Sequence, residues 1–167
     1  MEDLQALGFT GFRTVGFLRD EAAVSVPAEP GVWLVMRDAT GVPHFLARST
    51  AAHWRGRDPS ETADALGARW VARASVLYLA AAAGPGVRAL LQQRVKRFLR
   101  FGMGRNVAHW EGRVVWQLSG ATALRLAWKA LPATKARAEA ERLVGAFTDR
   151  YGLRPFANED EAGDDDQ

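Results

Sequence analysis

The stretch that decides the fold is residues 76–118, VLYLAAAAGPGVRALLQQRVKRFLRFGMGRNVAHWEGRVVWQL. It begins with a short apolar run, which is typical of a buried strand, and glycine and proline then end that run. A basic segment with apolar residues at helical spacing follows, and a glycine-rich loop separates it from a second apolar run. The stretch therefore predicts a strand, a helix, a loop and a strand, at residues 76–80, 87–100, 101–113 and 114–118.

The flanking sequence supplies the other predicted elements. An apolar run bounded by turn residues predicts a strand at 31–37, and 134–150 has the apolar spacing of a long helix that Gly152 ends. Ser60 is the predicted N-cap of another helix. We further expect an irregular opening with one helical turn at 7–18 and a hairpin turn at 38–43, followed at 44–48 by its partner strand or an edge extension. A strand at 123–129 is expected to pair with 114–118.

The composition and these elements predict one α+β domain, with a small central and mostly antiparallel sheet flanked by helices. The chain has 167 residues, of which 48% are hydrophobic, enough for one sizeable core. No apolar run is long enough to span a membrane, and no cysteine is present to form a disulfide or a thiolate zinc site. We therefore expect no membrane or disulfide partner, and a cytoplasmic location.

The charge is distributed unevenly along the chain. Lys and Arg number 22 against 19 Asp and Glu, but six of the acidic residues follow Asn158. Without those six the balance is 22 to 13, or +9. We expect 1–158 to form the domain and 159–167 a disordered acidic tail that could compete with nucleic acid for the basic body. Such a body favours nucleic acid as the partner; an arginine-rich proteome with a solubilising tail is the alternative.

Several short strings, taken in order, carry a resemblance to a known family. Gly31-Val32-Trp33 opens one predicted strand, Tyr78-Leu79-Ala80 lies in the next, and Arg94 lies on the helix that follows. Pro155 and Asn158 have a Pro-x-x-Asn spacing. This order resembles the GIY-YIG nuclease superfamily over about residues 8–158. Longer strings are similar to a bacterial subgroup of uncharacterised GIY-YIG-like proteins, at 56–59, 99–104, 109–118 and 155–158.

The resemblance implies a phosphodiester endonuclease that uses Mg²⁺. The sequence departs from the family pattern at several positions, among them Ala80 and Ala81, where the second motif has glycine and then lysine. Trp33 stands where the family has its first tyrosine, and an indole donates a hydrogen bond but cannot act as a base. The position of the family glutamate falls on Ala140, between Glu139 and Glu141. Glu139 lies closer to the apolar stripe of its helix, so it is the candidate metal ligand, with a solvated surface glutamate as the alternative.

Three residues are the candidate catalytic groups. Arg94 lies at the edge of the apolar stripe of its helix, so its guanidinium needs an anion there, either a phosphate or an internal carboxylate. The resemblance implies that Tyr78 faces the same cleft and orients a nucleophile; a core tyrosine is the alternative. His109 is a candidate general acid or base, because its ordinary pKa is near 6.5, or else a packing residue.

The remaining candidates are contacts to nucleic acid. Arginine side chains on the basic helix and in the glycine-rich loop can meet phosphates, and the resemblance adds the terminal asparagine. The predicted contacts are Arg88, Arg97, Arg100, Arg105, Arg113 and Asn158.

Three functions follow as hypotheses. The first is a GIY-YIG-like protein that binds nucleic acid, DNA in view of the resemblance, and cleaves it with low activity. The second is a binding module that has kept the basic cleft and lost catalysis. The third is a protein-interaction domain whose basic face receives an acidic partner.

Overall fold

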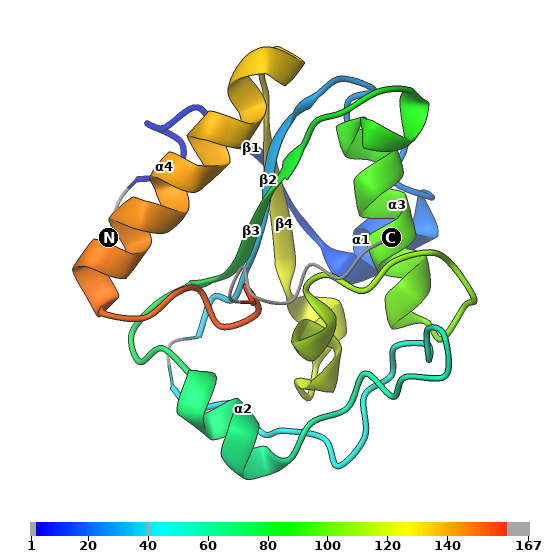
Figure 1. The fold of residues 1–167 in the computed structure, drawn as a ribbon, viewed down its shortest axis with the longest axis vertical. Coiled ribbons are helices and arrows are strands. Elements are labelled where there is room, and N and C mark those ends of the chain that lie inside the picture. Colours follow the sequence, from blue (N-terminus) through cyan, green and yellow to red (C-terminus); the bar gives the residue numbers. More distant parts are fainter. Residues whose placement is uncertain (1–2, 40, 160–167) are drawn as a thin grey trace.

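Four strands form one antiparallel sheet at the centre of the computed structural model, which describes residues 3–39 and 41–159 (Figure 1). The strands lie in the order β1-β4-β2-β3, and every neighbouring pair is antiparallel. Their bounds are β1 (Thr10–Thr14), β2 (Gly31–Met36), β3 (Val76–Ala82) and β4 (Arg125–Ala130). The predicted α+β class, with a small antiparallel sheet flanked by helices, is therefore confirmed.

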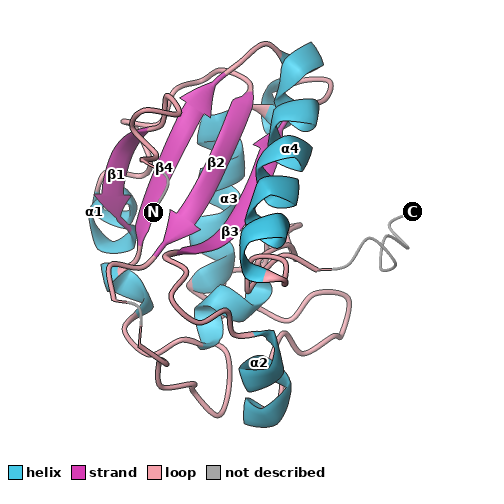
Figure 2. Ribbon diagram, turned by 90° about the vertical axis from the view of Figure 1, so that its left-hand side faces the viewer, coloured by secondary structure: helices cyan, strands magenta, loops and turns pink. Residues whose placement is uncertain are grey.

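Helices cover both faces of the sheet. The long helix α4 lies across one face, and α3 and α1 lie across the other (Figure 2). The helices are α1 (Val15–Asp20), α2 (Ala63–Arg69), α3 (Leu91–Gly102) and α4 (Ala133–Tyr151), with short 3₁₀ helices at Val87–Ala89, Arg113–Gln117 and Ala121–Ala123.

The central strand β2 is buried on both faces, which explains its continuous apolar sequence. Trp33 and Val35 pack into the cluster on the α3 side, whereas Val32 and Leu34 pack into the cluster on the α4 side. Alternate residues of a strand point to opposite faces, so a strand between two helical layers needs apolar residues at every position.

Three predicted elements are confirmed with small shifts of their bounds. These are the strands now seen as β2 and β3 and the long helix α4. Gly152 ends α4 with a φ of +77°, a conformation that glycine adopts without steric cost. The predicted strand at 123–129 is also confirmed as β4, but its partners are β1 and β2.

The predicted strand at 114–118 is wrong. The segment is a 3₁₀ helix, Arg113–Gln117, preceded by Gly112 at a φ of +70°. Val114, Val115, Trp116 and Gln117 are all buried, so no alternation marks the segment as a strand or as a helix. Short apolar runs have this ambiguity, because burial on all sides removes the periodic signal.

The predicted hairpin at 38–48 is wrong as well. The antiparallel partners of β2 are β3 and β4, which come later in the chain. Phe45 forms only an isolated bridge to Leu118, and Gln117 holds this loop by donating from its side-chain amide to the carbonyl of Leu46 at 2.9 Å. β3 and β4, which come from distant parts of the sequence, pair with the two edges of β2, so no edge of β2 is left for a strand at 44–48.

Smaller corrections concern where elements begin. The basic helix starts at Leu91 after the separate turn Val87–Ala89, and Thr62, not Ser60, caps α2. The opening contains β1 and α1, with an irregularity of the strand at residues 11–13. The predicted tail was 159–167; its first residue, Glu159, pairs with Arg113, and residues 160–167 lie outside the described residues. Among the described helices, none has the length and apolar character needed to cross a bilayer.

Candidate nucleic-acid interface

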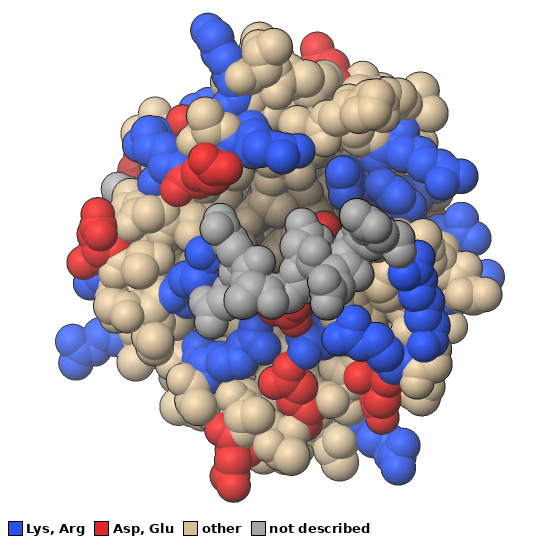
Figure 3. Space-filling model, in the orientation of Figure 1, with Lys and Arg blue, Asp and Glu red and all other residues tan. Residues whose placement is uncertain are grey.

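Helix α3 and the 3₁₀ turn before it place three arginines together at one edge of the fold. Its buried positions pack against the sheet, which leaves Arg94 and Arg97 half-buried at the boundary with solvent. Arg97 Nη2 donates to the carbonyl of Arg88 at 2.7 Å, so the 3₁₀ turn before α3 and the helix are tied together. We call Arg88, Arg94 and Arg97 the arginine face. Lys and Arg side chains gather over α3 and around a central hollow in Figure 3.

The arginine face has an excess of positive charge. Burial, and then the neighbouring charges of Arg94 and Arg88, lower the pKa of Arg97. The Nε atoms of Arg94 and Arg97 are both buried and have no hydrogen-bond partner among the described residues. Arg94 pairs with the carboxylate of Glu111, whose Oε2 is 3.9 Å from Nη1 and whose side chain is 65% exposed. An oxyanion at this face would therefore be attracted by three guanidinium groups, against the exposed carboxylate of Glu111.

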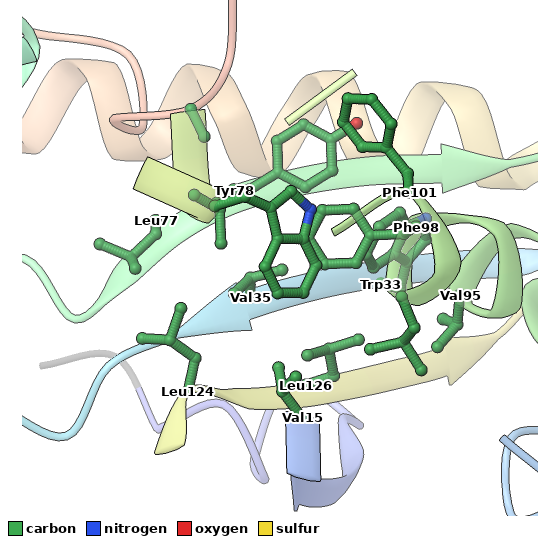
Figure 4. Close-up of a cluster of buried hydrophobic side chains, with 14 of the residues drawn as sticks. Val15, Trp33, Val35, Leu77, Tyr78, Val95, Phe98, Phe101, Leu124 and Leu126 are labelled. Atoms are coloured by element: carbon green, nitrogen blue, oxygen red, sulfur yellow. The ribbon is translucent and has the colours of Figure 1, made fainter. Parts of the chain in front are cut away.

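Tyr78 lies beside this face but is buried in the core. Its ring stacks on Phe98 of α3 and meets the edge of Trp33, with ring centroids 6.3 and 5.3 Å away (Figure 4). The residue is 4% exposed. Burial, and then the negative charge of Glu111, raise the pKa of its phenol well above the ordinary value, and the charge of Arg94 offsets part of this rise. The phenol is therefore neutral at pH 7.

His109 is a packed, neutral imidazole. It lies against the rings of Phe98 and Phe101, at centroid distances of 5.7 and 5.4 Å. Its Nε2 is 2.8 Å from the carbonyl of Glu111, so Nε2 carries the proton and donates it. Burial lowers the pKa of His109 to about 4, despite this hydrogen bond. The imidazole therefore fixes the loop at 109–111 and places Glu111 opposite Arg94.

The predicted catalytic residues do gather in one region. Arg94 and the imidazole of His109 each contact Glu111, and the rings of Tyr78 and His109 each contact Phe98. Trp33, in the position of the first family motif, lies in the same cluster at 1% exposure. Its indole N–H has no hydrogen-bond partner within the described part of the chain. Glu111 was not among the residues predicted from sequence, because its position opposite Arg94 depends on the loop that His109 holds.

Glu139, the predicted metal ligand, does not join this region. It lies on α4, on the opposite face of the sheet, and its carboxylate is 3.2 Å from Lys129 Nζ and 2.9 Å from Arg142 Nη2. Hydrogen bonds from Arg142, and then from Lys129, lower its pKa to about 2, despite partial desolvation. A Mg²⁺ ion beside Tyr78 and Arg94 therefore does not fit Glu139. Within residues 3–39 and 41–159, no three His, Asp or Glu side chains are grouped to hold a metal.

Arg113 and Asn158 lie near one another on the other side of the loop. Arg113 pairs with the carboxylates of Glu61 and Glu159. The amide of Asn158 pairs with both backbone groups of Leu79, accepting from its N–H at 3.0 Å and donating to its carbonyl at 2.9 Å. Asn158 therefore closes the free edge of β3. For Asn158 to contact nucleic acid as predicted, its side-chain amide would have to bind the nucleic acid in addition to, or in place of, the backbone of Leu79.

The last predicted contacts, Arg100 and Arg105, are exposed near the C-terminal end of α3. A tight turn lies beyond them: the backbones of Trp54 and Arg57 exchange hydrogen bonds of 3.1 and 2.9 Å, and Arg55 has a φ of +52°. Arg57 lies over the ring of Trp110, 4.6 Å from its centroid. Half-exposed aromatics with cations around them are suited to stacking on bases. The contact between Arg57 and Trp110 joins segments far apart in sequence, so no local pattern indicated it.

The fold and the site together define a small α+β protein with an arginine-rich face beside a buried aromatic cluster. Comparison with protein-family models, with curated proteins and with solved structures gave no match. The GIY-YIG resemblance therefore stays a prediction.

Proposed function

We propose that the protein binds nucleic acid through the arginine face of α3 and does not cleave it. The observation that carries this proposal is the crowding of Arg88, Arg94 and Arg97, with the Nε atoms of Arg94 and Arg97 buried and left unpartnered by the described residues. A phosphate suits such a face, because guanidinium forks match its oxygens and an anion relieves their mutual repulsion. Trp110 and the turn at 54–57 add a surface on which bases can stack.

Three features favour binding without cleavage. The phenol of Tyr78 is buried and its pKa is raised, so it is a poor base. The Nε2–H of His109 is held by the carbonyl of Glu111, and its low pKa makes it a weak base. Trp33 occupies the position where the resemblance implies another tyrosine. A Mg²⁺-dependent endonuclease is the second candidate, because Arg94, His109 and Tyr78 do surround Phe98 and Glu111.

Binding can be measured by fluorescence anisotropy with labelled single-stranded and duplex DNA, and with RNA, over a range of salt concentrations. We expect the double variant Arg94→Gln/Arg97→Gln to bind about tenfold or more weakly, and the salt slope to fall by about 2 if each arginine meets one phosphate. The matched control is Lys135→Gln/Arg137→Gln, which removes the same charge from exposed positions of α4. Circular dichroism checks the fold of each variant.

Three results would contradict the proposal. Absence of binding at low salt would reject a nucleic-acid function and leave an acidic protein partner as the remaining hypothesis. Equal losses in the double variant and its control would mean that net charge, and not the arginine face, drives binding. Nicking of supercoiled DNA that needs Mg²⁺ or Mn²⁺, stops with EDTA and is lost in Arg94→Gln would establish the endonuclease instead.

A further inference from the structure

A second basic site lies at a cavity that the arginine face does not include. The cavity has a volume of about 400 Å³ and lies between α2, the start of the 3₁₀ helix Arg113–Gln117, and the segment that follows α4. Its charged lining residues are Arg69, Arg113, Arg154 and Glu159. Leu153, Pro155 and Phe156 supply an apolar wall. A volume of this size is typical of sites for small ligands.

Two arginines of this cavity, Arg113 and Arg154, are not fully hydrogen-bonded by the described residues. The Nε atoms of Arg113 and Arg154 are buried and find no hydrogen-bond partner in residues 3–39 and 41–159. The side chain of Arg113 is 12% exposed, although it pairs with two carboxylates. Within the part of the chain that the structure describes, Arg154 forms no ion pair. Desolvated guanidinium groups without a full set of acceptors favour an added oxyanion.

The two carboxylates that pair with Arg113 differ in how firmly they are held. Glu61 is fixed by its backbone, because its N–H and its carbonyl both bond to the buried side chain of Gln117, at 2.9 and 2.7 Å. Its carboxylate orients Arg69 and Arg113. Glu159, in contrast, is 39% exposed, and only its side chain reaches Arg113. Glu159 is therefore the carboxylate that a ligand can replace.

We propose that this cavity binds a phosphate monoester, and that Glu159 occupies the position of its phosphate in the free protein. Once Glu159 moves away, the three arginines of the cavity are opposed only by the carboxylate of Glu61. The resulting local charge of +2 matches that of a phosphate dianion. The planar forks of Arg113 and Arg154 suit phosphate oxygens, and the apolar wall meets the organic group. The inference does not depend on the proposed function, because the arginine face is separate.

The probe is adenosine 5′-monophosphate, titrated into the full chain by isothermal calorimetry in low-salt buffer without phosphate, with adenosine as the uncharged control. We expect binding of the monophosphate and none of adenosine. Affinity should rise from about pH 5 to pH 7, because the second phosphate pKa is about 6 and the dianion is the better ligand. Oligonucleotides with and without a 5′-phosphate distinguish a nucleic-acid end from a free nucleotide as the source of the monoester.

Two variants test the assignment in opposite directions. Arg154→Gln should weaken binding of the monophosphate about tenfold, and Glu159→Gln should strengthen it about threefold or more by removing the internal competitor. The control Arg137→Gln removes the same charge from an exposed position of α4 and should change little. Absence of binding in both the wild type and Glu159→Gln would overturn the proposal, as would equal effects of Arg154→Gln and Arg137→Gln. Neither result bears on the binding of DNA at Arg94 and Arg97.

Discussion

His109 illustrates how burial changes the role of a residue. From sequence it is a candidate acid or base, because an ordinary imidazole titrates near pH 6.5. In the fold it lies between two phenylalanine rings and donates to the carbonyl of Glu111. The desolvation that lowers its pKa to about 4 keeps it neutral, so it packs and positions a loop.

The lowered pKa predicts a pH dependence of stability. The unfolded chain binds a proton at His109 below about pH 6.5, whereas the folded protein binds it only below about 4. Protonation of His109 therefore leaves the free energy of unfolding unchanged above about pH 6.5. It lowers that free energy as the pH falls from 6.5 to 4, by about 3 kcal/mol in total. His109→Gln should flatten this part of the curve, as measured by urea unfolding between pH 4 and 7.

The contribution of Glu139 lies in a separate, lower pH range. Its pKa is lowered to about 2, so its stabilisation is complete above about pH 4.5 and is lost as the pH falls toward 2. Glu139→Gln is therefore the matched control, because it should leave the slope between pH 4 and 6.5 unchanged. A wild-type curve that is flat between pH 4 and 6.5 would show that His109 is not held neutral.

At the level of elements, the contact of β2 with β4 and α3 depends on Gly31, the first residue of the strand. A Cβ at this position would lie 2.1 Å from the carbonyl oxygen of Lys129 on β4 and 2.9 Å from Leu91 Cδ1 on α3. The backbone oxygen cannot move without breaking the pairing of the strands. The glycine that opens the first motif is therefore needed for packing, whatever its role in chemistry.

Gly31→Ala should destabilise the protein by about 3 kcal/mol, since overpacking against backbone forces the strand or the helix to shift. Gly145→Ala on the exposed face of α4 is the matched control, because no described atom lies within 4 Å of the place its Cβ would take and alanine favours a helix by about 1 kcal/mol. Urea midpoints measured at pH 7 compare the two. An unchanged midpoint for Gly31→Ala would mean that β2 and β4 are not this close.

At the level of the whole molecule, the net charge of +3 combines a basic body with an acidic C-terminal segment. Residues 160–167 contain five acidic residues and no basic one, so removing them raises the net charge to +8. The chain approaches its C-terminus beside Arg113, where Glu159 already forms an ion pair. Removing these five negative charges should strengthen the attraction of the remaining chain for an anionic ligand at low salt.

A variant that ends at Glu159 should bind DNA more tightly, by about threefold to tenfold at low salt, and the difference should decrease as salt screens the charges. Anisotropy titrations at several salt concentrations measure this. A second variant keeps the full length and replaces the five acidic residues by their amides; it should behave like the truncation. An increase in the truncated protein alone would assign the effect to length and not to charge.

The sequence by itself determined the elements whose signal is local. The strands β2 and β3 and the helix α4 are continuous apolar or periodic runs bounded by glycine or proline, so propensity and burial agree along each run. The same local runs predicted the α+β class, and the positions of the charged residues gave the uneven distribution of charge.

Only the tertiary structure decided which residues meet. Residues 114–118 lost their predicted strand because β1 and β2 pair with β4. Glu139 was placed with Lys129 across the sheet from Arg94, and Glu111 was placed opposite Arg94 by a loop whose Glu111 carbonyl accepts from His109. These outcomes depend on contacts between segments far apart in sequence, and those contacts decide which groups are buried and which of them pair, so no local pattern could encode them.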